Sequence, residues 1–239
     1  MKTYGLYLES GPKRMKTMVH VPELLGCIAV GPTTEEALAA TPDAICMYLR
    51  FLQACGEKVD LRAAFKTRVV DHITEGMWLG NGSPYVLFGS DVKQVSAKEI
   101  EALLGRYHGM REALASWAES RTAKQLDAAP KGGGRTARAI LLHVAGSGGG
   151  YLSPVVGGVK GFSAVHGGAE RGEIPIPEAL RRVDTMAAEV VRGTTAKQRS
   201  AVIERPKDSR TLRKALRRML EHDWEHLVEL SRRRGGPAL

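Results

Sequence analysis

Apolar residues at helical spacing dominate the chain after residue 95. A capping box at Ser96-Ala97-Lys98-Glu99 opens the first of these stretches, which continues to about Glu119. Three further stretches show the same spacing: one from Thr136 through Val144, one from Ile176 to about Val191, and one from about Ser209 to Arg234. Four such helices predict a four-helix bundle.

Glycine-rich sequence separates the second and third predicted helices. The run Gly148-Gly149-Gly150 either ends the second helix early or lets another helix approach it closely. Residues 152–172 predict a long loop, and the segment from Thr194 to Lys207 is ambiguous.

Alternating apolar and polar residues predict strands in the first 90 residues. The expected strands are residues 3–8, Lys13 to Val21, a short third strand within Pro22 to Gly31, and Thr67 to Ile73 as part of a β-rich stretch over 66–88. A helix capped by Thr33 and ended by Gly56 is expected after the third strand. The predicted fold class is therefore α+β, with a small α/β module at residues 1–90 and the bundle at 96–235.

Three short motifs in the N-terminal part point to a known family. They are Val21-Pro22-Glu23-Leu24-Leu25-Gly26-Cys27, Gly31-Pro32-Thr33-Thr34-Glu35-Glu36-Ala37-Leu38 and Gly56-Glu57. Over about 55 residues the order of three strands and a helix resembles the HicB-like antitoxin domain. The resemblance implies a small α/β module of a bacterial protein that binds a protein partner.

Composition narrows the classes of function. The net charge is +9, from 35 basic and 26 acidic residues. The excess lies largely at 205–218 and 232–234. Such an excess could attract nucleic acid or anionic ligands, but we expect a solvated helix face there. The few aromatic residues do not interleave with the basic ones, as they do in proteins that stack nucleic-acid bases. The three cysteines lack CxxC spacing, which argues against a disulfide framework and a cysteine zinc site. No run of 18 apolar residues and no secretory segment are present, so we expect a cytoplasmic protein that does not enter the membrane.

Two histidines on the last predicted helix are candidate metal ligands. His222 and His226 are four residues apart, so both project from one face, together with Ala215, Met219 and Leu230. A pair at this spacing can supply two metal ligands, and a third must come from elsewhere. His143 lies on the second predicted helix with apolar neighbours.

Over about residues 96–235 the chain resembles the DinB-like metal-binding domain, an antiparallel four-helix bundle. The features that carry the resemblance are a histidine on the second helix, a long third helix and His-x-x-x-His on the fourth. The resemblance implies that His143, His222 and His226 bind one divalent metal, zinc or nickel, and leave a coordination position open. It further implies a metal-dependent thiol transferase or a hydrolase acting on a small molecule, with a low-molecular-weight thiol as one candidate. No catalytic residue is assigned.

Two other readings stay open. The chain could be a non-catalytic, HicB-like interaction or regulatory protein with a structural metal, and a homodimer is a further candidate assembly. Asp223 and Glu225 flank the histidine pair; we expect both to be solvent-exposed rather than to support the ligands. His72 is expected to be structural.

Overall fold

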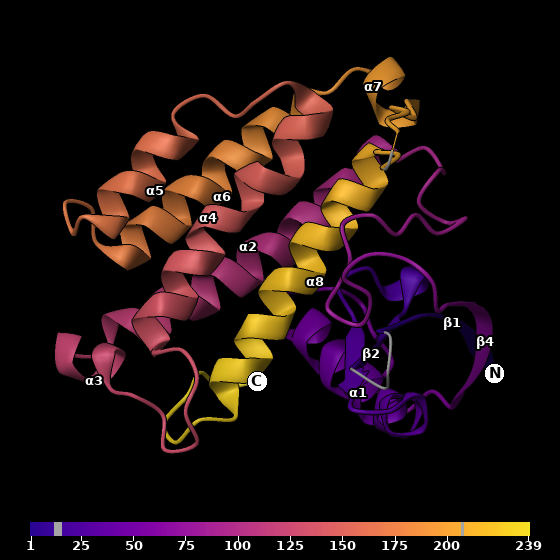
Figure 1. Cartoon of the computed structure of the whole chain (residues 1–239), viewed down its shortest axis with the longest axis horizontal. Helices are drawn as coiled ribbons and strands as arrows, with labels where there is room; N and C mark the ends of the chain where they lie inside the picture. The colour runs from indigo at the N-terminus through magenta and orange to yellow at the C-terminus, as the bar shows by residue number, and fades with distance from the viewer. Residues whose placement is uncertain (12–15, 207) are drawn as a thin grey trace.

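The computed structural model describes residues 1–11, 16–206 and 208–239, and it begins with a four-stranded sheet (Figure 1). The strands are β1 (Lys2–Ser10), β2 (Thr17–His20), β3 (Ile28–Gly31) and β4 (Phe65–Ile73), in the order β3-β2-β1-β4. β1 pairs in parallel with β4 and antiparallel with β2, which pairs antiparallel with β3. Each of the four predicted strands is present in the sheet. The second was predicted from Lys13 to Val21 and is seen at Thr17–His20; residues 12–15 lie outside the described residues.

Helix α1 (Thr34–Ala54) covers the sheet and contacts β2 and β3. The side chain of Thr33 caps it, as predicted. The predicted third strand begins only at Ile28, because Pro22–Leu24 form a turn of 3-10 helix, in which proline occupies a first-turn position where no backbone donor is required. The β-rich stretch predicted over 66–88 is wrong beyond Ile73. In its place a loop packs Leu79, Val86 and Phe88 against the sheet.

Four long helices form the bundle: α2 (Ala97–Glu119), α4 (Ala137–Val156), α6 (Ile176–Arg192) and α8 (Leu212–Ser231). Three short helices lie between them: α3 (Ala123–Asp127), α5 (Phe162–Glu170) and α7 (Ala196–Ser200). The capping box at Ser96 is confirmed. Helix α8 is shorter than predicted because Thr211 caps its N-terminus and Arg232 its C-terminus.

The bundle is not antiparallel throughout. Arg192 bonds Glu101 and Arg181 bonds Glu119, so α2 and α6 run in opposite directions. Helices α4 and α8 are also antiparallel. Helices α2 and α8 run in the same direction, because Glu99 pairs with Arg213 and Trp117 bonds Gly235. It follows that α4 and α6 are parallel, and the predicted antiparallel arrangement is wrong for two of the four neighbouring pairs.

Helix α5 accounts for the parallel course of α4 and α6. The segment predicted as a loop over 152–172 contains the end of α4 and all of α5, which returns the chain along α4 before α6 begins. The glycine run allows this return. A Cβ at Gly149 would lie 2.5 Å from the ring of Phe162, and one at Gly146 would lie 2.6 Å from His166. The close approach of another helix is therefore the correct one of the two interpretations.

Helix α8 lies between the bundle and the N-terminal unit, the sheet and α1 together (Figure 1). One hydrophobic core runs through both parts. The prediction of a solvated basic face is wrong here, since Lys214, Arg217 and Arg218 are each at most 5% exposed. The division of the chain near residues 90–96 remains a prediction.

Among the described residues, α4 is the one helix long and apolar enough to cross a membrane by length and composition. Its contacts with α6 and α8 in the core of the bundle account for the same apolar composition.

Candidate metal centre

The three predicted histidines come together on two antiparallel helices. His143 projects from α4, while His222 and His226 project from one face of α8. One nitrogen from each ring lies within 4.8 Å of the others. The Nε2 atoms of His143 and His222 are 2.9 Å apart, and the ring centroids of His222 and His226 are separated by 4.6 Å.

Carboxylates face the opposite side of the two α8 rings. Nδ1 of His222 lies 3.2 Å from Oδ1 of Asp223, and Nδ1 of His226 lies 3.0 Å from Glu229. A carboxylate at Nδ1 holds the proton there and leaves Nε2 with a free lone pair, which is the tautomer that binds a metal.

Loss of contact with water, partial at His143 and nearly complete at His222 and His226, favours the neutral form of the three rings. The largest cause that holds the pKa of each ring below its ordinary value is the loss of contact with water. The next largest cause is the neighbouring ring of His226 for His143, and that of His222 for His226. His222 and His226 are 7% and 5% exposed, whereas His143 is exposed. Neutral imidazoles with converging nitrogens are the donors that borderline divalent ions prefer, so this donor set fits a metal ion.

Asp223 is fully buried, which contradicts the prediction that it is solvent-exposed. Nε of Arg111, from α2, donates to its Oδ2 at 2.6 Å, and Oδ1 faces His222. Nη2 of Arg111 donates to the carbonyl of Val144 on α4 at 2.8 Å. Arg111 and Asp223 therefore link three helices directly behind the histidines. Glu225 is partly exposed and pairs with Lys16 at 3.0 Å.

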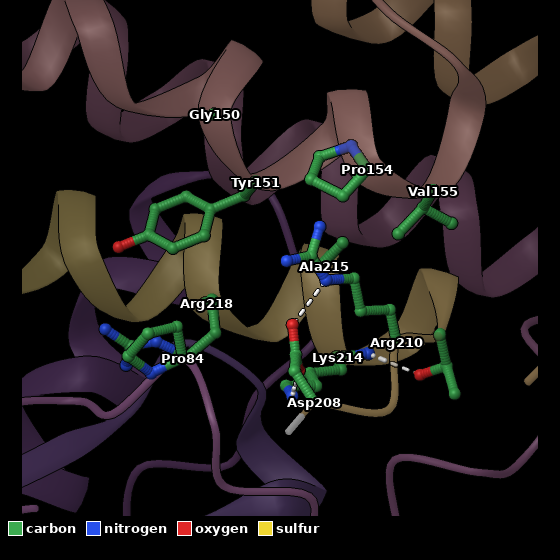
Figure 2. Close-up of a pocket in the computed structure, with 11 residues that line it drawn as sticks. Pro84, Gly150, Tyr151, Pro154, Val155, Asp208, Arg210, Lys214, Ala215 and Arg218 are labelled. Carbon is green, nitrogen blue, oxygen red and sulfur yellow. Dashed lines mark hydrogen bonds and ion pairs between the residues drawn. The ribbon is translucent and has the colours of Figure 1, made fainter. Parts of the chain in front are cut away.

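Tyr151 borders the site on α4, about two helical turns after His143. Its ring lies edge-on to His222, with the centroids 5.8 Å apart, and the guanidinium carbon of Arg218 lies 5.8 Å from the centroid of the same ring. Figure 2 shows the hydroxyl of Tyr151 directed away from Pro154 and Val155. A small cavity of about 90 Å³ lies beside it, between α4 and α8. Tyr151 thus separates this cavity from His222.

The other histidines lie outside the cluster. His72 bonds Ser10 at 2.8 Å in the sheet, and His108 pairs with Asp184 on the bundle surface. His20 is buried against Glu221, with Nδ1 2.8 Å from its carboxylate.

Sequence reasoning missed Arg111, Asp223 and Glu229 as supports of the site. A signal for Arg111 was present, because it falls within the apolar stripe of Leu104, Tyr107 and Leu114 on the first bundle helix. A charge in such a stripe requires a buried partner of opposite charge.

Comparison with protein families matches residues 106–230 to the DinB superfamily. The matched segment makes up just over half of the chain and contains all three histidines. No curated protein matches the chain, and no solved structure matches it. The N-terminal unit lies outside the matched segment, so its resemblance to HicB-like antitoxins stays a prediction.

Proposed function

Because the chain belongs to the DinB superfamily, we propose that it is a metal-dependent enzyme whose reactive centre is a divalent ion bound by His143, His222 and His226. The convergence of the three imidazole nitrogens within 4.8 Å is the observation that carries the proposal. Zinc and nickel suit three neutral nitrogen ligands. Three protein ligands leave room for a further one, which is characteristic of catalytic sites.

The reaction we propose is a transfer involving a small thiol or a hydrolysis. A bound ion supplies Lewis acidity, lowering the pKa of a water or thiol that reaches it. The chain's own groups keep the site ready for the ion. Asp223 and Glu229 orient the rings of His222 and His226, and Arg111 holds Asp223 ionised in a buried position.

A second candidate is partner binding by the N-terminal unit, with the metal in a structural role. Strand β4 lies at the edge of the sheet, and Val69 and Val70 on it are 47% and 46% exposed. An exposed edge strand offers unpaired backbone groups to another chain. A pull-down that recovers a stoichiometric protein partner, together with no turnover of any substrate tried, would favour this candidate.

Metal analysis tests the leading proposal. We expect about one zinc or nickel ion per chain in the purified protein and its loss in His222→Ala. His108→Ala is the matched control, because its side chain is 64% exposed and lies outside the cluster. Metal retained at the wild-type level in His222→Ala overturns the assignment.

A substrate screen with and without low-molecular-weight thiols then separates transfer from hydrolysis. Activity that survives complete removal of metal counts against both reactions.

A further inference from the structure

A cavity of about 640 Å³ lies between the N-terminal unit and the C-terminal half of α8. Its volume falls within the range of about 300–1,000 Å³ that is typical of small-molecule sites. One wall comes from β3 and α1, and the other comes from α8 and Arg135. His226 lines it, so the cavity adjoins the three-histidine cluster.

The body of the cavity is largely apolar. Six of its apolar lining residues, from both walls, are Ile28, Val30, Ala44, Met47, Trp224 and Val228. Trp224 is held in place by Tyr48 and Phe51 of α1, with ring centroids 4.8 and 5.1 Å away. Trp224 is only 2% exposed, so it makes this wall rigid, while the partly exposed side chains of Met47 and Val228 offer the contact area for an apolar group.

The end of the cavity beside His226 is electropositive. Glu229 is the carboxylate there; Arg233 donates to it at 3.0 Å, and Arg135 lies 3.5 Å away. Arg232 lines the same cavity, and no carboxylate within the described ranges lies within 4.0 Å of its guanidinium. Three arginines therefore face one carboxylate.

The remaining charges do not offset this excess near His226. Glu225 is paired with Lys16 at 3.0 Å. Asp43 lies on α1, on the opposite wall, and is exposed to solvent.

We infer that this cavity binds an organic anion with an apolar body, its charged group at Arg135 and Arg232 and its body against Met47 of α1 and Val228 of α8. The N-terminal unit then selects the ligand, although it lies outside the segment matched to the family. The identification of this ligand as the substrate of the metal centre rests on the proposed function. The binding of the ligand in the cavity is independent of the proposed function.

The probe is 1-anilinonaphthalene-8-sulfonate, an aromatic anion of this class, titrated into the full chain by fluorescence. We expect one saturable site and binding weakened about tenfold or more in Ala44→Phe, because the new ring takes the place of the ligand's apolar body beside Met47. Ala39→Phe is the matched control, since Ala39 is exposed on the same helix and does not line the cavity. Equal affinity in Ala44→Phe and the wild type overturns the inference.

Charge is tested separately, so that the result does not depend on how Ala44→Phe folds. We expect Arg232→Gln to weaken the probe about threefold and to reduce the effect of salt. Arg234→Gln, an exposed change two residues away, leaves the affinity unchanged. If Arg232→Gln and Arg234→Gln weaken probe binding equally, the probe is attracted by general surface charge, and the proposed anion site is wrong.

Titrations with zinc and with chelator separate this inference from the proposed function. We expect Ala44→Phe to keep the metal content of the wild type. Saturable binding that persists in chelator supports the cavity even if the metal assignment fails. If the probe binds neither the zinc-loaded protein nor the protein in chelator, the inference about the cavity is wrong and the metal assignment is unaffected.

Discussion

Asp223 connects the histidine cluster to a buried charge. Its carboxylate binds Nε of Arg111 at 2.6 Å and faces Nδ1 of His222 at 3.2 Å. We expect Asp223→Asn to weaken metal binding about 10- to 100-fold, because His222 loses its orienting carboxylate. The free energy of unfolding should fall by about 3–5 kcal/mol, because Arg111 is left buried without a counter-charge. Metal titration and denaturant unfolding measure the two effects.

The control for this change is Glu225→Gln. Glu225 and Lys16 form a partly exposed ion pair, with side chains 27% and 37% exposed. Such pairs contribute about 0–1 kcal/mol, so the control should leave stability nearly unchanged. A loss in Asp223→Asn no larger than in the control would contradict the role assigned to Asp223.

Protons compete with the metal at the three histidines. Burial holds their pKa values below the ordinary value, so the folded protein keeps them neutral while the unfolded chain takes up protons at about pH 6.5. The stability they contribute is therefore present above that pH and lost as the pH falls through it. We expect zinc to raise the thermal midpoint near neutral pH and the increment to shrink below about pH 6. Equal increments at about pH 5 and pH 7.5 would exclude histidine ligands.

The sequence predicted the three histidines but not the groups behind them. Spacing places His222 and His226 on one face because helical geometry is local. Asp223 depends on Arg111, which is 112 residues away, so its burial is a property of the packed bundle. The apolar stripe around Arg111 could have indicated a buried charge, but not which carboxylate receives it.

At the scale of helices, the glycines of α4 have different roles. A Cβ at Gly150 meets nothing within 4 Å, whereas one at Gly149 would lie 2.5 Å from the ring of Phe162. We expect Gly150→Ala to stabilise the protein by about 0.5–1 kcal/mol, because alanine restricts the unfolded chain and suits a helix.

Gly149→Ala should destabilise, since α5 must move away from α4. Denaturant midpoints of the two single variants, measured side by side, check the contrast. A stabilising Gly149→Ala would mean that Phe162 does not pack on α4 as described.

Helix positions were easier to predict than the connection between α4 and α6. The caps at Thr33 and Ser96 are local signals, and the structure confirms both. The continuation of α4 through its glycines is not local, because α5 and α2 pack where side chains would otherwise stand. Glycine weakens an isolated helix, so the sequence alone could not decide whether the run ends the helix or lets another helix approach it.

At the scale of the molecule, buried ion pairs join the two parts of the chain. Arg217 bonds Asp91 through Nε and Nη2, each at 2.9 Å, and donates to Glu221 at 2.9 Å; Glu221 also meets His20 of β2. Burial alone would raise the pKa of Glu221, but Arg217, His20 and Arg218 outweigh it and hold the pKa far below its usual range. The chain's net positive charge gave no indication of this network, because net charge does not show which cations are paired.

We expect Glu221→Gln to lower the free energy of unfolding by about 3–5 kcal/mol at neutral pH, because the buried guanidinium groups of Arg217 and Arg218 lose a shared carboxylate. A carboxyl with a depressed pKa contributes stability above its unfolded value, about 4.3, and loses it as the pH falls. The difference in the free energy of unfolding between the wild type and the variant should therefore become smaller in acid.

Unfolding of the wild type should give a single transition that coincides when it is followed by circular dichroism and by tryptophan fluorescence. Two separate transitions would show that the parts unfold independently.

The position of α8 also has a consequence for how the protein is made. His20 emerges from the ribosome 201 residues before Glu221, its partner in the finished structure. Tyr48 and Phe51 likewise precede Trp224, on which they pack. The nascent N-terminal unit therefore exposes apolar and charged surface throughout the synthesis of the bundle. The whole chain becomes stable only once its last long helix has been translated, and until then the surface that α8 covers is open to chaperones and to aggregation.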